Sequence, residues 1–277
     1  MSQRKMFREE DLKKALVAVD AKLGRGIRAY LIGGCAMTFM GRKVATKDID
    51  LVFGSTEDAR DFVAAMRLSG FRHVRKVTGP YSALGAFAIM EDTDEMRFDV
   101  YDRQVCRGLE LSSGMKSRAR SYQKLRNLEI CLMSAEDIFL FKGITERDTD
   151  LDDMQILAEA GIDWKTVERE CLSQKRSGRW AYMLGTKLVD LRAKSSIQAP
   201  IIKRLFDYAD VDLLTYVFGQ IIGKDERSFK DIFAIIKEKY NYSETWTRKQ
   251  LELLSRKRIV GKKRVGRHDT YYIEKNR

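Results

Sequence analysis

Proline is scarce in this chain, and its scarcity leaves the domain boundaries poorly marked. Only two of the 277 residues are proline. Histidine is equally rare, because His73 and His268 are the only two and lie far apart in the sequence. So few histidines exclude a metal site built from several of them. A metal bound here would be held mainly by carboxylates, which favours a hard ion such as Mg²⁺ or Mn²⁺.

The four cysteines form no metal-binding or disulfide pattern. They stand at positions 35, 106, 131 and 171 without a CxxC pair, so we expect reduced thiols. Apolar runs are also short, and none approaches the ~18 residues of a membrane-spanning helix. The opening residues, MSQRKMFREEDLKK, are too charged for a secretory signal. We therefore expect a cytoplasmic protein with no membrane partner.

Positive charge is in excess, and the excess is concentrated near the C-terminus. The chain has 52 Lys and Arg against 40 Asp and Glu, a formal charge of +12. Residues 223–277 hold 16 of the basic and 8 of the acidic residues, which is +8 of that charge. A local excess of this kind is typical of a surface that binds a polyanion.

Hydrophobic spacing in the first half predicts a mixed sheet of four or five strands flanked by helices. Leu12, Leu16 and Val19 recur at helical intervals, and Ser55 followed by Asp58 is a helix-capping pattern. Helices are expected over 9–23, 35–41 and 55–70, and strands over 27–33, 49–53, 71–77, 84–90 and 96–102.

From Ser134 onward the hydrophobic period is helical, with capped helices expected over 134–147 and 148–161 and two or three more before residue 209. Three further helices and a strand pair follow, the last helix running from Ser243 to about Lys257. Three helices followed by a basic hairpin are typical of a winged helix-turn-helix. We expect an α+β chain with three domains, at 1–132, 133–209 and 210–277.

Two aspartates one residue apart, Asp48 and Asp50, stand at the start of a buried apolar run. Residues two apart on a strand share a face, so both carboxylates project together, and their repulsion favours a cation between them. Asp99 in RFDVY is a third strand carboxylate. If the two strands are adjacent, the three aspartates can hold two Mg²⁺ ions roughly 3.5–4 Å apart. Taken singly, Asp48 as a cap and Asp50 as a salt-bridge partner stay open.

Gly33 and Gly34 lie where a predicted strand turns into a helix. Lacking Cβ atoms, they let backbone N–H groups approach a ligand closely. The N-terminus of the next helix favours an anion such as a triphosphate. Arg42, Lys43 and Lys47 can add positive charge there.

Together these residues resemble the nucleotidyltransferase superfamily, which includes DNA polymerase beta-like enzymes and antibiotic-modifying transferases. IGGCAM, KDIDLVF and RFDVY are similar to its GG turn, its DxD strand and its later strand with a third aspartate. The likeness is greatest to the AbiE-toxin-like prokaryotic branch, in which a later helix carries a lysine and then acidic residues. Lys142, Asp150 and Asp153 in FKGITERDTDLDD stand at that place. The resemblance covers about residues 10 to 160.

The resemblance implies a nucleotidyltransferase fold over residues 1–132 that transfers a nucleoside monophosphate from an NTP to an acceptor. It assigns catalysis and Mg²⁺ or Mn²⁺ binding to Asp48, Asp50 and Asp99, with Asp99 also helping to deprotonate the acceptor hydroxyl. It assigns nucleotide binding to Gly33, Gly34, Cys35, Lys47 and Lys142.

Some of these assignments have alternatives. Position 35 is Cys where many catalytic members have Ser, and a thiol is a poor hydrogen-bond donor. Lys142 is alternatively a solvated helix residue. Asp150 and Asp153 alternatively cap their helix or pair with Arg147.

The tail carries the candidate nucleic-acid contacts. Recognition helices contact bases near their N-terminal end, and cations on a wing contact phosphates. The residues assigned to DNA or RNA are Thr247, Arg248, Lys249, Lys262, Lys263, Arg264 and Arg267. Packing or dimerisation through this module is the alternative.

Two functions are therefore compared. The first is a metal-dependent nucleotidyltransferase whose tail recruits its acceptor, with tRNA and protein as the acceptors considered. The alternative is a DNA-binding winged-helix regulator with a degenerate nucleotidyltransferase domain, and a third hypothesis is the toxin of a two-gene system. The three aspartates favour the enzyme.

Overall fold

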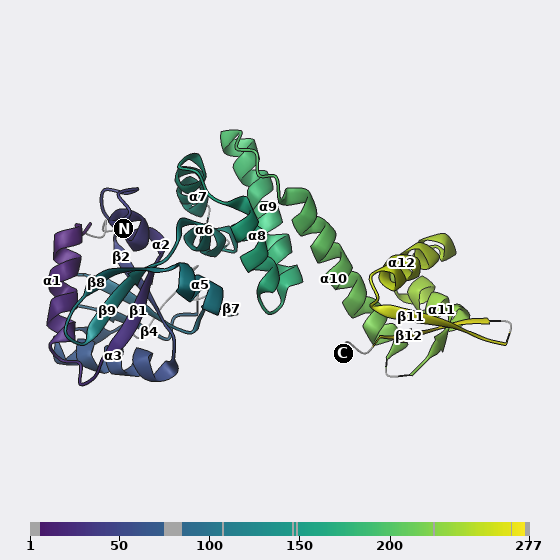
Figure 1. Cartoon of the computed structure of the whole chain (residues 1–277), viewed down its shortest axis with the longest axis horizontal. Coiled ribbons are helices and arrows are strands. Elements are labelled where there is room, and N and C mark those ends of the chain that lie inside the picture. The colour runs from purple at the N-terminus through teal and green to yellow at the C-terminus, as the bar shows by residue number, and fades with distance from the viewer. Residues whose placement is uncertain are drawn as a thin grey trace. The chain divides into compact units, whose positions relative to one another are not determined.

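The computed structural model describes residues 6–74, 85–106, 108–145, 147, 149–223, 225–266 and 268–274. By its internal contacts the chain divides into a first unit, residues 1–203, and a second unit, residues 204–277 (Figure 1). The helices that follow Ser134 group with the first unit as far as Lys203. A separate helical domain over 133–209 remains a prediction.

Seven strands of the described residues form a mixed sheet in the first unit. They are β1 (Ile27–Ile32), β2 (Asp48–Phe53), β3 (Arg72–His73), β4 (Ala88–Glu91), β5 (Arg97–Asp102), β8 (Arg120–Lys124) and β9 (Leu128–Leu132). Their order is β3-β4-β5-β2-β1-β9-β8, with β2 parallel to β5 and β1 parallel to β9. The expected α+β class with a mixed sheet and flanking helices is confirmed. The expected number of strands was too low, because β8 and β9 were not predicted.

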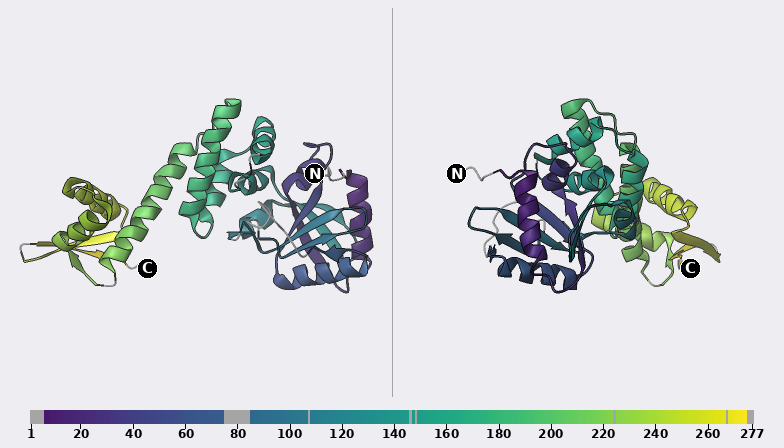
Figure 2. Two further views of the ribbon diagram at one scale, coloured as in Figure 1. Left: turned by 180° about the vertical axis from the view of Figure 1, so that it is seen from behind. Right: turned by 60° about the vertical axis from the view of Figure 1, so that its left-hand side comes forward.

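Helix α3 (Thr56–Leu68) packs on the sheet face that is opposite the aspartates of β2 and β5. Phe62 of this helix meets Phe53 and Phe98, with ring centroids 4.9 and 6.3 Å apart respectively. The predicted cap is present, since the Ser55 hydroxyl accepts from the Asp58 N–H at 3.0 Å. Helix α1 (Glu9–Asp20) packs beside α3 (Figures 1 and 2). The aspartates thus lie on the other face of the sheet, where α2 (Gly33–Phe39) packs on β1 and β2.

Beyond the sheet, α6 (Ala135–Gly143) is the centre of a helical layer. It contacts α2 (Gly33–Phe39), α7 (Thr149–Glu159), α8 (Trp164–Ser173) and α9 (Ser177–Ser195). Gly143 permits a close crossing with α9, because an added Cβ would lie 2.4 Å from Leu184 Cδ1. A small hairpin, β6 (Gln104–Val105) and β7 (Leu109–Glu110), and helix α5 (Ser113–Arg118) join β5 to β8.

The second unit has the three helices and the strand pair expected from its sequence, and one short strand, β10, that was not expected. Its elements are α10 (Ile202–Ile222), β10 (Arg227–Ser228), α11 (Phe229–Tyr240), α12 (Glu244–Arg256), β11 (Val260–Val265) and β12 (His268–Ile273). The hairpin β11–β12 joins β10 in a three-stranded sheet. Ile232, Ile236, Leu251, Leu254 and Tyr271 are buried in its core. The winged-helix assignment itself remains a prediction.

Within the described ranges, no helix combines the length and the apolar character that crossing a bilayer requires.

Candidate active site

The three aspartates predicted to act together lie on one face of the sheet. Strands β2 and β5 are parallel neighbours, and Asp50 stands directly opposite Asp99. Asp48, two residues before Asp50, points to the same side, while Ile49 between them is buried against the other. The adjacency on which the sequence hypothesis depended is therefore present.

Arg97 is a member of this cluster that sequence reasoning did not identify. It stands opposite Asp48 in the β2–β5 register and is itself 4% exposed. Its guanidinium group donates two hydrogen bonds to the Asp99 carboxylate, from Nε to Oδ1 at 2.5 Å and from a terminal amino group to Oδ2 at 2.9 Å. Nε also lies 3.9 Å from Asp48 Oδ1. A cation two residues before Asp99 was the available signal, because that spacing puts both side chains on one face.

The Gly33 backbone lies directly against the Asp50 side chain. Gly33 begins α2 with a φ of +67°, and an added Cβ would lie only 2.3 Å from Asp50 Oδ2. Only glycine fits this approach, because any side chain would collide with the carboxylate and strain the backbone. The GG turn and the DxD strand are thus in contact.

Asp50 lies in an environment that disfavours its negative charge. Burial, followed by the negative charges of Asp99 and Asp48, raises its pKa to about 7. The positive charges of Lys142 and Arg147 act in the opposite direction but do not offset these effects. Carboxylates that repel one another in this way are stabilised by a bound cation.

The donor set fits a hard divalent ion through Asp48 and Asp50. Both are half-buried carboxylates on one face of β2, and oxygen is the ligand that Mg²⁺ and Mn²⁺ prefer. Across the parts of the chain that the structure describes, no three acidic, histidine or cysteine side chains are arranged to hold a metal as they stand. At the aspartate cluster, the Arg97 guanidinium group covers both oxygens of Asp99. Asp99 can join such a site only when its hydrogen bonds with Arg97 are broken.

Lys142 lies in a second, buried cluster. Its Nζ is 2.8 Å from Asp150 Oδ1 and 2.8 Å from Asp153 Oδ2, and the residue is only 5% exposed. The alternative of a solvated helix residue is therefore wrong. Arg147 also donates two hydrogen bonds to the Asp150 carboxylate, at 3.0 and 3.1 Å. The suggested pairing of those two residues is therefore present.

Lys43 links the second cluster to the GG turn. Its Nζ pairs with Asp153 on α7, and a Cβ added to Gly34 would lie 3.8 Å from the same Nζ. Because Lys142 and Arg147 also act on the charge of Asp50, the two clusters are electrostatically coupled. The cations next to the aspartates are thus held in place by the helical layer.

Two other residues assigned to nucleotide binding have different surroundings. Cys35 is fully buried in α2, and burial raises the pKa of its thiol. Its side chain therefore does not face a ligand, and any contribution at this position comes from the backbone. Lys47 is exposed just before β2 and forms no ion pair with a described residue.

In the second unit, most of the assigned basic residues lie at the surface. Arg248 stacks over the Phe229 ring at 3.7 Å and pairs with Glu244, and Lys249 is exposed. On the hairpin, Lys262 pairs with Asp269 and Lys263 with Glu226, while Arg264 is exposed. Thr247 is buried, and its hydroxyl donates to the Ser243 carbonyl at 3.0 Å. Arg267 lies outside the described residues.

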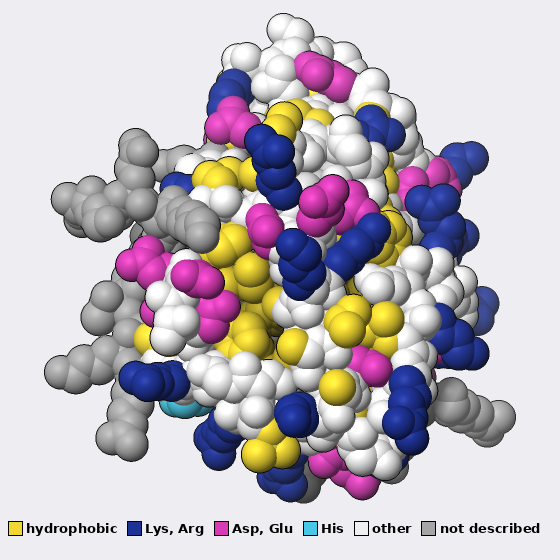
Figure 3. All heavy atoms as spheres, turned by 90° about the vertical axis from the view of Figure 1, so that its left-hand side faces the viewer, with side chains coloured by type: hydrophobic (Ala, Val, Ile, Leu, Met, Phe, Trp, Pro, Cys, Tyr) yellow, Lys and Arg dark blue, Asp and Glu magenta, His cyan; other side chains and the backbone are white. Residues whose placement is uncertain are grey.

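Charges of both signs mix on the face of the molecule shown in Figure 3. Lys and Arg side chains alternate there with Asp and Glu, around a hollow in which hydrophobic side chains are exposed. That face therefore shows no broad field of one sign.

Comparison with known proteins adds little to this geometry. No protein-family model matches the chain, and no curated protein matches it. A solved structure that it resembles is the crystal structure of a "putative nucleotidyltransferase from H. pylori", with 15% sequence identity and a TM-score of 0.35. The match covers 73% of this chain and 92% of that one. A likeness at this level assigns neither fold nor family.

Proposed function

We propose that the chain is a metal-dependent nucleotidyltransferase, which transfers a nucleoside monophosphate from an NTP to an acceptor hydroxyl. The observation that supports this most strongly is the shared face of Asp48, Asp50 and Asp99, with the Gly33 backbone against Asp50. A purely structural role for Asp50 as a salt-bridge partner is not supported, because its carboxylate makes no ion pair with a described residue and its pKa is raised.

In this proposal the chain's own residues position the nucleotide. The backbone N–H groups at the start of α2 bind the triphosphate, because a helix N-terminus carries partial positive charge. Asp48 and Asp50 would hold Mg²⁺ or Mn²⁺, which when bound would neutralise phosphate charge and polarise the phosphoryl group whose phosphorus is attacked. Lys47, which is exposed, would add positive charge along the phosphates. Lys142 is buried between Asp150 and Asp153, so its direct contact with the nucleotide is not proposed, and it acts through its effect on the charge of Asp50.

The third aspartate would act on the acceptor. Asp99 accepts the proton of the acceptor hydroxyl as the new oxygen–phosphorus bond forms at the α-phosphate and the bond to pyrophosphate breaks. In the observed arrangement Arg97 covers both oxygens of Asp99. A rearrangement of this ion pair must therefore precede proton transfer.

The acceptor is proposed to be a nucleic acid, recruited in part by the second unit. Support comes from the exposed cations Lys249 and Arg264 and from the +8 charge of residues 223–277. Arg248, Lys262 and Lys263 would add to this surface once their acidic partners are displaced by phosphate.

The proposal is tested by a transfer assay. The full chain is incubated with Mg²⁺, each α-³²P-labelled NTP in turn, and total tRNA or protein. We expect label in an acid-precipitable acceptor for at least one NTP, and loss of that label in the Asp50→Asn variant. An Asp94→Asn variant, altered at an exposed turn, is the matched control. Labelling that persists in Asp50→Asn would contradict the assignment.

A further inference from the structure

A cavity lies at the opposite end of α2 from the GG turn. It has a volume of about 600 Å³, within the ~300–1,000 Å³ range of small-molecule sites. Its walls come from the end of α2, the following loop, strand β8 at the edge of the sheet, and the first residues of α6. All of these elements belong to the first unit.

Two arginines of this cavity have uncompensated charge. Arg42 and Arg120 are exposed and form no ion pair with any described residue. The acidic residue in the lining is Glu136, and its carboxylate accepts the Asp163 N–H at 3.2 Å. Unpaired guanidinium groups on a concave surface are suited to phosphate, because their N–H groups match its oxygens.

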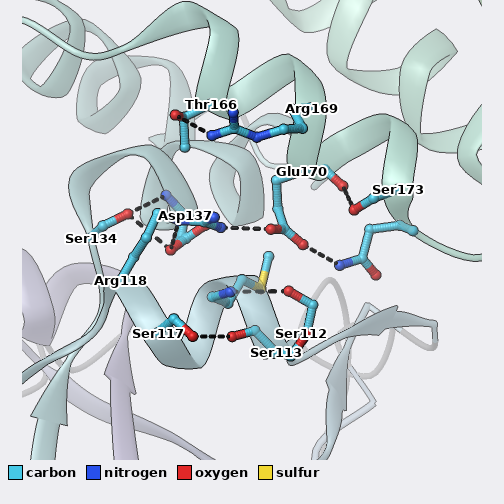
Figure 4. A network of polar contacts seen from close by, with 12 residues as sticks. Ser112, Ser113, Ser117, Arg118, Ser134, Asp137, Thr166, Arg169, Glu170 and Ser173 are labelled. Atoms are coloured by element: carbon cyan, nitrogen blue, oxygen red, sulfur yellow. Dashed lines mark hydrogen bonds and ion pairs between the residues drawn. The ribbon is translucent and has the colours of Figure 1, made fainter.

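A third arginine, Arg118, is fixed in the wall instead of being available to a ligand. Its terminal amino group donates to Asp137 Oδ1 and to Glu170 Oε2, each at 2.6 Å. Figure 4 shows Arg118 between these two carboxylates, with Ser134 beside Asp137. The network joins the end of α5 to α6 and α8, so the Arg118 side chain is fixed by its two acidic partners.

Aromatic rings supply an apolar surface in the same cavity. Phe39 and Tyr122 lie with ring centroids 4.8 Å apart at an angle of 56°, and Phe39 and Met40 are half-exposed. The Tyr122 hydroxyl donates to Glu9, which fixes its ring. Aromatic rings next to arginines are the combination that single-stranded nucleic acids use, because bases stack while phosphates pair.

We propose that this cavity binds one nucleotide unit, with its phosphate on Arg42 and Arg120 and its base against Phe39 and Met40. The same chemistry is offered by a free nucleoside monophosphate and by a single-stranded nucleic acid. The position of the cavity favours a single-stranded nucleic acid over a free nucleotide, because the seven residues of α2 separate the cavity from the GG turn by about 10 Å. Its use by the acceptor strand rests on the proposed transferase function, whereas binding itself does not.

Two consecutive cations serve the two sites separately. Lys43 pairs with Asp153 beside the GG turn, whereas Arg42 lines the cavity. The α2–β2 loop thus contributes to both, so a strand in the cavity would place its end near the aspartates.

The test is equilibrium binding of a 5′-fluorescein-labelled single strand of about six nucleotides, as RNA and as DNA, to the full chain by fluorescence anisotropy. The titration is made without divalent metal between about 50 and 200 mM NaCl. The variant is Arg42→Ser/Arg120→Ser. The control is Arg60→Ser/Arg67→Ser, which removes two exposed arginines from α3.

We expect the variant to bind about tenfold more weakly, with a salt slope shallower by about 0.7, since the one phosphate held by the two arginines is no longer neutralised. The control should stay within about twofold of the unaltered chain. Competition by free nucleoside monophosphate would identify a mononucleotide pocket, and its failure to compete would identify a strand; either supports nucleotide binding. Equal effects of variant and control, or no binding by the unaltered chain, would overturn the proposal.

The outcome is separable from that of the proposed function. Asp50→Asn should abolish nucleotidyl transfer and leave strand binding unchanged. Arginine-dependent binding in a chain without transfer activity would therefore support the cavity and contradict the enzyme.

Discussion

Among single residues, Gly33 imposes the tightest geometric requirement on the proposed site. It combines a left-handed backbone with direct approach to Asp50, and each requirement alone restricts the residue that fits. Gly41 shares the left-handed backbone, with a φ of +71°, but an added Cβ there would meet nothing within 4 Å. Alanine substitutions at Gly33 and Gly41 therefore distinguish the effect of backbone strain from the effect of collision with the Asp50 carboxylate.

Gly33→Ala should lower kcat/KM for nucleotidyl transfer by about 100-fold, because displacement of a reacting group by about 1 Å has an effect of that size. Gly41→Ala should leave kcat/KM nearly unchanged. Gly41→Ala should lose about 1 kcal/mol of unfolding free energy, since an L-residue in the left-handed region is strained, and Gly33→Ala should lose more because its Cβ also collides with Asp50. Steady-state kinetics and urea unfolding measure the two effects, and equal kinetic losses would contradict the contact.

Arg97 and Asp99 form a buried pair whose disruption should be costly. Arg97→Gln leaves the Asp99 carboxylate buried without its counter-ion, and we expect a loss of about 3 kcal/mol in unfolding free energy. Arg103→Gln removes an arginine whose side chain is 66% exposed, and should change stability by less than about 0.5 kcal/mol. Mg²⁺ should recover part of the loss in Arg97→Gln, because Asp99 can then join the other two carboxylates. Similar losses in both variants would be evidence against this pairing.

Much of the candidate site could be predicted from the sequence, because a strand's period of two fixes which residues share a face. That rule placed Asp48 with Asp50 correctly. The register that puts Asp50 opposite Asp99 depends on which strands pair. That pairing was assumed, and the sequence did not predict it. Arg97 was not predicted, because only carboxylates were considered as members of the cluster and the cation two residues before Asp99 was not.

At the scale of elements, the helical layer positions the cations of the site. Helix α6 carries Lys142 and α7 carries Asp150 and Asp153, so the salt bridges between them also join the two helices. Burial alone would raise the pKa of Asp150, but the charges of Lys142 and Arg147 hold that pKa below its usual value. The ionised form is therefore stabilised by folding.

Asp150→Asn should destabilise the chain by about 3 kcal/mol at neutral pH, since it leaves Lys142 and Arg147 without a buried counter-charge. A lowered folded-state pKa gives stability that is present above the unfolded-state pKa of ~3.9 and lost as pH falls through the folded-state value. The difference from the unaltered chain should thus be constant between about pH 7 and 5 and shrink below about pH 4. Thermal unfolding across this range measures it, and a difference that grows on acidification would contradict the sign.

The elements that sequence reasoning missed also have a physical explanation. Strand β8 lies at the sheet edge and carries Arg120, Ser121 and Lys124 at its exposed positions, so it has no apolar alternation. Strand β9 is apolar but short, and it is identified only by pairing between β1 and β8. Capped helices were predicted correctly at Ser55 and Ser134, and the start of the last helix at Ser243, because signals at helix ends are local.

For the whole molecule, charge is divided unequally between the two units. The excess near the C-terminus includes exposed Lys249 on α12 and Arg264 on β11. If these residues contact phosphates, Lys249→Ser/Arg264→Ser should weaken binding of a DNA duplex and make its salt slope shallower by about 1.8. Lys230→Ser/Lys239→Ser on α11 removes the same charge and should have a smaller effect. Salt-dependent anisotropy distinguishes them, and equal slopes would show that only net charge matters.

The central claim is that the aspartates and the GG turn bind a metal–nucleotide complex. Its most direct test is isothermal titration of each NTP into the full chain with Mg²⁺ and with EDTA, repeated with Asp50→Asn and with Asp94→Asn. We predict binding of at least one NTP that requires Mg²⁺, is lost in Asp50→Asn and is retained in Asp94→Asn. Absence of NTP binding at millimolar concentration, or binding that Asp50→Asn does not affect, would contradict the claim.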